Sequence, residues 1–220
     1  MIVRCRQILL ISQSSDILGG KKVMFSCGCL GEDESGLRMP KVLPRLPPMR
    51  AEHEGKMTLV LDLDETLVHS SLDPSPAYDY SIEVEMKSRM RQTFFVLKRP
   101  GVDDFLAAVA SKFEVVLFTA STKGYADAVL DVLDPGGRIS HRLYQDSCSV
   151  LRGIIIKDLS LLGRQLSKVL IVDNNPQSYM LQPANAVPIS SFRDDLQDLE
   201  LVEVFLDLEM IATAGNVAID

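Results

Sequence analysis

The segment Met57–Leu63 (MTLVLDL) is apolar at successive positions and ends among two acidic residues, Asp62 and Asp64. Apolar residues at successive rather than alternating positions are typical of a strand buried on both faces, as in a parallel sheet. Two carboxylates at the end of such a strand cost free energy unless a partner neutralises them. The segment therefore indicates a buried parallel sheet whose strand end has a chemical reason to hold acids.

Strand and helix patterns alternate along the rest of the chain. Further strands are expected at Tyr80–Met86, Thr93–Leu97, Glu114–Phe118, Lys168–Val172 and Asn185–Ile189. Helices are expected at Val102–Lys112, Gly124–Leu133 and Asp195–Ile211. The alternation predicts an α/β fold with a parallel sheet flanked by helices, and the first two of these strands form a β-hairpin inserted after the first strand.

The first fifty residues differ from the rest. Four prolines fall within Pro40–Pro48, which indicates a linker, so we expect residues 1–50 to be a disordered or linking extension and residues 51–220 to be one domain. Residues 1–50 hold eight Lys/Arg and four Asp/Glu, a net charge of +4, whereas the remainder has a net charge of −11. Because nucleic-acid binding depends on clustered Lys and Arg, we expect no nucleic-acid partner.

Several features bear on location. No run of about 18 apolar residues occurs, so no membrane span is expected. Four cysteines without a CxxC pair favour reduced thiols in a nuclear or cytoplasmic protein over a zinc site. The first fifteen residues contain Arg4 and Arg6 and no acid, a weak similarity to a mitochondrial targeting segment.

Polar residues follow three of the expected strands, and ligands of open α/β sheets bind beyond the carboxyl ends of strands. We therefore expect one crevice surrounded by residues from these three ends and by a lysine that precedes the last of them: Asp62, Asp64, Thr119, Lys157, Asp173 and Asn174.

These groups suit phosphoryl transfer. Asp62 and Asp64, two apart in an extended segment, point to the same side, so either a cation neutralises them or one is protonated. Mg²⁺ prefers such oxygen ligands. One carboxylate can attack phosphorus while the other donates a proton to the leaving oxygen. Lys157 and Thr119 would hold the phosphoryl oxygens.

Each group taken singly has an ordinary structural explanation. The two acids could cap a loop or helix, Thr119 could be a capping hydroxyl, and Asp173-Asn174 could be a turn. His69 has no evident proton-transfer partner in the sequence and is interpreted as structural. The ordered set, rather than any one member, favours catalysis.

Four segments resemble the motifs of haloacid dehalogenase (HAD) superfamily phosphatases, and more narrowly the FCP/SCP type, the small phosphatases of the RNA polymerase II C-terminal domain. The resemblance extends from Met57 to Met210, about seventy per cent of the chain. The segments are DLDETLVHSS (Asp62–Ser71), LFTAS (Leu117–Ser121), KDLSLLGR (Lys157–Arg164) and DNNPQSY (Asp173–Tyr179).

The resemblance implies a HAD-like Rossmannoid sheet with a small three-stranded insert, and a monomer that acts on phosphoserine and phosphothreonine in proteins. It implies that Asp62 is the nucleophile and Asp64 the general acid and later base, with Thr119 and Lys157 holding the phosphoryl group. It also implies Mg²⁺ bound by the Asp62 carboxylate, the Asp64 main-chain carbonyl and the Asn174 side chain, with Asp173 beside it.

The chain departs from the family pattern at two positions. Gln145 stands where the small phosphatases generally have a substrate-gripping arginine, and Leu72 where they have an aromatic residue in a proline-binding pocket. Losing the arginine removes a fixed charge and a bidentate donor, so the departures bear on the polymerase-tail substrate and leave the catalytic residues intact. Two alternatives remain open: a HAD phosphatase of small metabolites, and a non-catalytic binding module like the mitochondrial import relatives of this fold.

Overall fold

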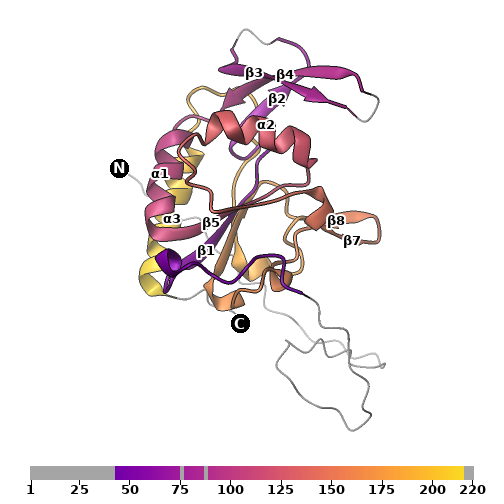
Figure 1. Ribbon diagram of the computed structural model, residues 1–220. Helices are drawn as coiled ribbons and strands as arrows, with labels where there is room; N and C mark the ends of the chain where they lie inside the picture. The colour runs from indigo at the N-terminus through magenta and orange to yellow at the C-terminus, as the bar shows by residue number, and fades with distance from the viewer. Residues whose placement is uncertain (1–42, 75–76, 87–88, 216–220) are drawn as a thin grey trace, which may run out of the picture. The chain divides into compact units, whose positions relative to one another are not determined.

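The computed structural model describes residues 43–74, 77–86 and 89–215, and its centre is a five-stranded sheet. The strand order is β10-β9-β1-β5-β6, and every neighbouring pair is parallel (Figure 1). The strands are β1 (Met57–Leu61), β5 (Phe113–Phe118), β6 (His141–Leu143), β9 (Val169–Asp173) and β10 (Ala186–Pro188). The predicted parallel α/β sheet is thus confirmed, and the predicted strands that form it differ from the observed ones by one or two residues at their ends.

Burial on both faces explains the unbroken apolar runs of the central strands. In β1, Leu59 and Leu61 face a cluster that includes three helices, whereas Val60 faces a second cluster on the opposite side of the sheet. The helices are α1 (Val102–Lys112), α2 (Lys123–Leu133) and α3 (Glu200–Ala214). None of the helices in the described part of the chain is long and apolar enough to cross a membrane.

The second face of the sheet is covered differently. Its cluster contains residues from the 3-10 turn Leu159–Leu162 but none from α1, α2 or α3. Leu46 is also part of this cluster, with 2% of its surface exposed, and the main chain of Arg45 donates to the Leu161 carbonyl at 2.9 Å. The described end of the expected linker thus packs on the sheet, while the rest of the expected extension, residues 1–42, lies outside the described residues.

A second sheet is inserted between β1 and α1. Its strands run antiparallel in the order β2-β4-β3, and α2 lies beneath it (Figure 1), where the Tyr80 hydroxyl donates to the Val129 carbonyl at 3.3 Å. The strands are β2 (Val68–Ser71), β3 (Tyr80–Glu85) and β4 (Arg91–Lys98). The hairpin β3–β4 was predicted from alternation, and β2 completes the three-stranded insert that the family resemblance implied.

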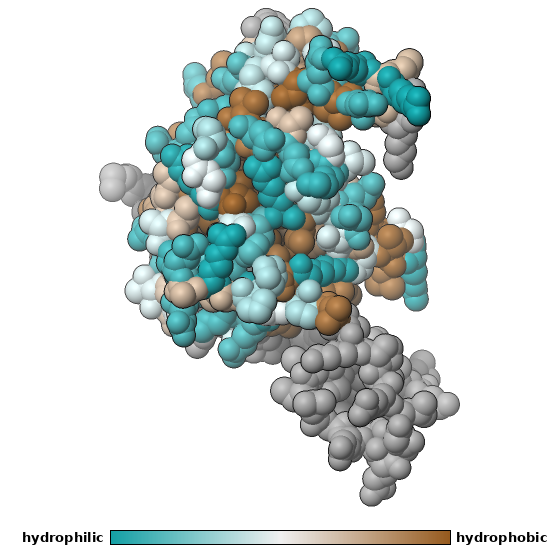
Figure 2. All heavy atoms as spheres, in the orientation of Figure 1, coloured by the Kyte–Doolittle hydropathy of each residue, from teal (hydrophilic) through white to brown (hydrophobic). Residues whose placement is uncertain are grey.

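A short hairpin, β7 (Ser149–Leu151) and β8 (Ile154–Ile156), was not predicted. Strands of three residues are too short to display alternation. Arg152 and Gly153 form the turn with φ of 51° and 82°, the positive values that a tight hairpin turn requires. Figure 2 shows hydrophobic atoms gathered at this hairpin; its exposed apolar residues are Val150, Leu151 and Ile155.

Helix α3 begins at Glu200, not at Asp195 as the periodicity indicated. The reason is Asp198, which accepts the main-chain N–H of Glu200 at 3.0 Å and also pairs with Arg99. Those two bonds hold the chain in a turn before the helix begins.

Arg99 is 1% exposed and joins three segments of the fold. Its guanidinium binds both carboxylate oxygens of Asp198, at 2.8 and 2.7 Å. It also donates to the main-chain carbonyls of Thr66 and Ser190, at 3.2 and 2.9 Å. The end of β4, the loop after β1 and the loop before α3 are therefore fixed to one buried charge.

We expect Asp198→Asn to lower the free energy of unfolding by about 3–5 kcal/mol near neutral pH, because it leaves Arg99 buried without a counter-charge. Burial raises the pKa of Asp198, but Arg99 outweighs this and leaves the pKa below its usual value. A lowered native pKa stabilises the fold above the unfolded pKa, and this contribution disappears as the pH falls through the native value.

Chemical denaturation of both proteins from neutral to acidic pH tests this, and the difference between them should shrink in acid. The exposed Asp194→Asn is the control, with a change of at most about 0.5 kcal/mol. A difference that stays constant with pH would contradict the assignment to the Arg99–Asp198 pair.

Candidate active site

The site lies where the order of the sheet strands reverses direction. Strand β1 has β5 on one side and β9 on the other, so their carboxyl ends meet at a topological switch point, where ligands of open α/β sheets bind. A cavity of about 270 Å³ opens there. The structure brings all six sequence-predicted site residues to its lining: Asp62, Asp64, Thr119, Lys157, Asp173 and Asn174.

Lys157 is the buried cation at the centre of this cavity, with 2% of its surface exposed. It follows β8, and its ammonium group lies 2.5 Å from Asp62 Oδ1 and 2.6 Å from Asp173 Oδ2. Burial alone would lower the pKa of Lys157, but the two carboxylates outweigh it and raise the pKa, so the side chain remains charged. One cation thus bridges the ends of β1 and β9.

The Asp62 carboxylate is fixed on both of its oxygens. Lys157 binds Oδ1, and the Thr66 hydroxyl donates to Oδ2 at 3.0 Å. The main-chain N–H of Asp62 donates to the Val172 carbonyl at 3.0 Å, which continues the β1–β9 pairing to this residue. The carboxylate therefore has little rotational freedom, as a group that must meet a reacting atom in one orientation requires.

Asp64 has a different environment although it is only two residues away. Its carboxylate accepts from the Ser121 hydroxyl and from the Tyr125 hydroxyl, each at 2.6 Å, and has no cation bound to it in the described structure. Burial raises the pKa of Asp64 above its ordinary value, and the two hydroxyls only partly offset this. Burial thus favours the protonated form of Asp64, whereas Asp62 is paired directly with an ammonium group.

Thr119 lies at the end of β5 and is 1% exposed. Its hydroxyl accepts the main-chain N–H of Ser121 at 2.9 Å and lies 3.5 Å from Asp64 Oδ2. Thr119 therefore holds the segment from Thr119 to Ser121 at the wall of the cavity, and its own hydroxyl donates a long hydrogen bond to Asp64.

The oxygen groups around Asp62 suit a hard divalent cation. Asn174 donates from its amide nitrogen to Ser191 at 2.9 Å, which leaves its amide oxygen 3.4 Å from the Thr66 hydroxyl that also binds Asp62. Among the residues that line the cavity, Lys157 is the cation, and it contacts the carboxylates of Asp62 and Asp173 but not that of Asp64. Within the described ranges, no group of three or more His, Cys, Asp or Glu residues is arranged to hold a metal. A cation here would need carbonyl, amide and water ligands as well, which is the coordination that Mg²⁺ accepts.

The sequence did not reveal three of the side chains that organise this site. Thr66, Ser121 and Tyr125 hold the two aspartates, as described above. The first two lie inside the motif segments DLDETLVHSS and LFTAS, which was the available signal. Tyr125 gave none, since an aromatic residue in the first turn of a helix is ordinarily a packing residue.

The two departures from the family pattern lie outside the lining of this cavity. Gln145 begins a 3-10 turn and its main-chain N–H donates to the Ser121 carbonyl at 3.0 Å. Leu72 is 57% exposed at the end of β2. Arg152, the cation next to the missing arginine in sequence, sits at the tip of the β7–β8 hairpin.

Comparison with known proteins identifies the family. The model of a family described as NLI interacting factor-like phosphatase matches residues 57–218, which include the whole site. The chain belongs to this family. It is 52% identical over 162 residues to a probable C-terminal domain small phosphatase of Dictyostelium discoideum, over 74% of this chain and 53% of that protein.

A human relative, the CTD small phosphatase-like protein, is 48% identical over 78% of this chain and 62% of that protein. The human carboxy-terminal domain RNA polymerase II polypeptide A small phosphatase 1 is 45% identical over 84% of this chain and 71% of that protein. The chain thus spans between about half and three quarters of the length of these relatives.

Two solved structures share the fold. Fission yeast RNA polymerase II CTD phosphatase Fcp1, solved as a variant bound to beryllium fluoride, matches with a TM-score of 0.53 at 22% identity, over 74% of this chain and 54% of that chain. A second structure of Fcp1 matches with a TM-score of 0.55 at 22% identity, over 74% and 52%. At this identity the match bears on the fold alone, and it agrees with the predicted HAD-like architecture.

We expect Tyr125→Phe to raise the pKa of Asp64 further. The Tyr125 hydroxyl donates to the ionised carboxylate and so lowers its pKa; removing the donor favours the protonated form. The Phe ring keeps the edge contact that Tyr125 makes with Phe94 at 5.1 Å, so the helix should stay in place.

Titration of the aspartate carboxyl carbons by NMR measures this shift directly. Tyr144→Phe is the matched control, because the Tyr144 hydroxyl donates to Asp127 rather than to Asp64. An Asp64 pKa that is the same in wild type and Tyr125→Phe would show that the hydrogen bond does not form in solution.

Proposed function

We propose that this protein is a Mg²⁺-dependent phosphoprotein phosphatase that works through an aspartyl-phosphate on Asp62. The observation that supports it best is the contrast between two neighbouring aspartates. Asp62 is held in one orientation by Lys157 and Thr66, as a nucleophile must be. Burial raises the pKa of Asp64 more than its hydroxyl partners lower it, as a general acid requires.

The reaction has two steps. The Asp62 carboxylate attacks phosphorus, the bond from phosphorus to the serine or threonine oxygen breaks, and Asp64 gives its proton to that oxygen. Asp64, now ionised, then takes a proton from water, whose oxygen attacks the phosphorus of the aspartyl-phosphate. Inorganic phosphate leaves, and both aspartates return to their starting states.

The remaining groups bind and orient the phosphoryl group and the metal ion. Lys157 and the Thr119 hydroxyl face the cavity between the two aspartates and would bind the phosphoryl oxygens, where charge neutralisation supplies most of the catalysis. The Asp62 carboxylate, the Asp64 carbonyl and the Asn174 amide oxygen would hold Mg²⁺, with Asp173 beside it. When bound, the ion neutralises phosphoryl charge that Lys157 alone does not match.

The substrate class follows from the relatives. The human small phosphatase 1 is named for the carboxy-terminal domain of RNA polymerase II, and we propose phosphoserine or phosphothreonine in that domain or in a similar phosphoprotein as the substrate. We propose the nucleus as the place of action and a monomer as the active form. The catalytic cavity is open enough for a side chain on a peptide. Gln145 in place of arginine weakens the grip on the substrate rather than the chemistry.

Asp62→Asn should abolish phosphate release, because the amide cannot form the aspartyl-phosphate. Release is measured from a phosphoserine peptide of the Tyr-Ser-Pro-Thr-Ser-Pro-Ser type and from an aryl phosphate, with and without Mg²⁺. Wild type should release phosphate from both only when Mg²⁺ is present, and the variant should lose more than about 10³-fold in kcat/KM.

The outcomes separate the candidate functions. Release from the aryl phosphate but not from the peptide would keep the mechanism and point to another phosphoprotein or to a small metabolite. No release from either substrate by the wild type would contradict the enzyme hypothesis and favour a binding module of this fold.

Mg²⁺ alone should stabilise the protein, since an ion that binds only the folded state raises its stability. At a concentration about a hundredfold above the dissociation constant, the gain is about 2.7 kcal/mol. Asn174→Ala should reduce this gain, because it removes one of the ligands. The control is Asn175→Ala: Asn175 also lines the cavity, but its side chain accepts the main-chain N–H of Gln177 at 3.1 Å and is not one of the proposed ligands.

Thermal melting over a Mg²⁺ titration measures this gain in stability without any assay of activity. Equal stabilisation of Asn174→Ala and wild type would overturn the proposed ligand set.

A further inference from the structure

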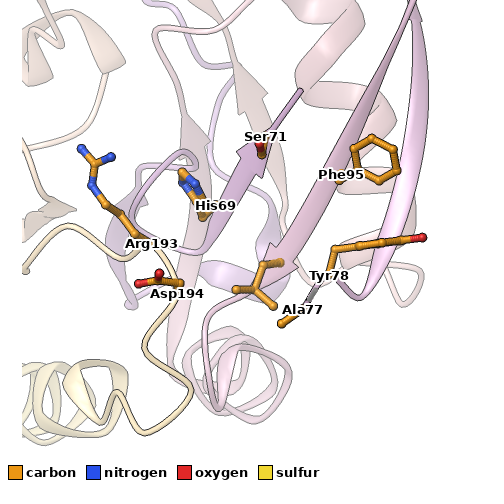
Figure 3. Close-up of a pocket in the computed structure, with 8 residues that line it drawn as sticks. His69, Ser71, Ala77, Tyr78, Phe95, Arg193 and Asp194 are labelled. Carbon is orange, nitrogen blue, oxygen red and sulfur yellow. The ribbon is translucent and has the colours of Figure 1, made fainter. Parts of the chain in front are cut away.

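A second cavity, of about 280 Å³, lies beside the insert on the face turned away from α2. Figure 3 shows His69, Arg193 and Asp194 on one side of it and the side chains of Tyr78 and Phe95 on the other. None of the proposed catalytic residues lines it. At about 30 Å³ per molecule, it would hold roughly nine waters, which is room for a large side chain.

One wall of this cavity is aromatic. The rings of Tyr78 and Phe95 meet edge to face with centroids 5.0 Å apart, and Tyr78 is 46% exposed. In β4, Phe94 and Val96 face the other way, toward the core cluster, so Phe95 and Leu97 line the outer face, which in a half-buried sheet is ordinarily polar. Phe95 is only partly buried there and Tyr78 is exposed, so both rings are accessible to a ligand, whereas Leu97 is 8% exposed and forms the floor.

The charges around the cavity cancel. Arg193 and Asp194 have opposite charges, and neither has an ion-pair partner in the described part of the chain. The Ser71 hydroxyl already accepts the main-chain N–H of Asp73 at 3.1 Å, and His69 already binds Glu65. With no net charge, and with Ser71 and His69 already hydrogen-bonded, the cavity favours an apolar occupant that packs on its two rings over an ionic one.

The cavity adjoins the catalytic one through a shared wall. Glu65 lines the catalytic cavity, and its carboxylate lies 3.3 Å from Nδ1 of His69, which lines the second cavity. The main-chain N–H of Phe192 donates to the Glu65 carbonyl at 2.7 Å, which fixes the loop that leads into Arg193. If a peptide places its phosphorylated side chain in the catalytic cavity, the residues next to it in sequence can reach the second cavity, since an extended chain covers about 3.3–3.6 Å per residue.

We propose that this second cavity binds a large apolar side chain of the phosphoprotein substrate, from a residue near the phosphorylated serine or threonine. The inference rests on the proposed function and adds a specificity site to it. Leu72, where the family resemblance expects an aromatic residue, does not line the cavity, so the site differs from the one that the resemblance implies.

The test compares phosphoserine peptides that have alanine at every flanking position with peptides that have leucine at one flanking position in turn. One leucine position should raise kcat/KM of the wild type about tenfold or more, the discrimination that a pocket gains from a few extra buried carbons. Tyr78→Ala should bring the ratio of the leucine to the alanine peptide close to one. Ala77→Phe, which fills the cavity instead of emptying it, should do the same.

Met90→Ala is the matched control, because Met90 is 68% exposed on the same insert and does not line the cavity. It should keep the preference, and thermal melting verifies that all three variants are folded. A wild type without any positional preference, or a preference that survives in both cavity variants, would overturn the inference. Turnover of peptides and of an aryl phosphate without that preference would leave the proposed function intact, whereas no turnover at all would overturn both.

Discussion

The buried ammonium of Lys157 is the interaction on which the site depends. It binds Asp62 at the end of β1 and Asp173 at the end of β9, and all three side chains are almost entirely buried. Two carboxylates brought together at a strand switch point would repel each other and lose their hydration, so without a counter-charge at least one of them would take up a proton. The β7–β8 hairpin ends directly before Lys157, and the lysine main chain is anchored to Ser178, so these otherwise irregular segments place the cation.

The two aspartates differ in their hydrogen-bond partners, although only one residue separates them. The chain turns immediately after Asp64, where Glu65 has a φ of 58°, and Asp64 then faces α2 rather than Lys157. Tyr125 contributes one hydroxyl to Asp64, and burial together with the Asp64 charge raises the pKa of Tyr125, so it stays a donor. Because α2 also supports the insert, the helix that holds Asp64 is the one on which the second sheet rests.

Much of this arrangement could be predicted from the residues. The continuous apolar runs located β1, β5 and β9, and the bounds of α1 were predicted correctly from Val102 to Lys112. The short strands β6, β7 and β8 were missed, because three residues are too few to show periodicity; β10 is as short but was located within the predicted segment Asn185–Ile189. The start of α3 was placed five residues too early, because the pairing of Asp198 with buried Arg99 cannot be seen in a local pattern.

The sequence alone determined the central strands of the parallel sheet and the polar residues that meet at its edge, because the carboxyl ends of parallel strands lie on one side and burial on both faces leaves a clear apolar signal. Only the tertiary structure decided that Lys157 neutralises Asp62 and Asp173 while Ser121 and Tyr125 hold Asp64. Those partners are separated by tens of residues in the sequence. Their contacts depend on how loops and helices pack, and no local pattern of residues indicates that packing.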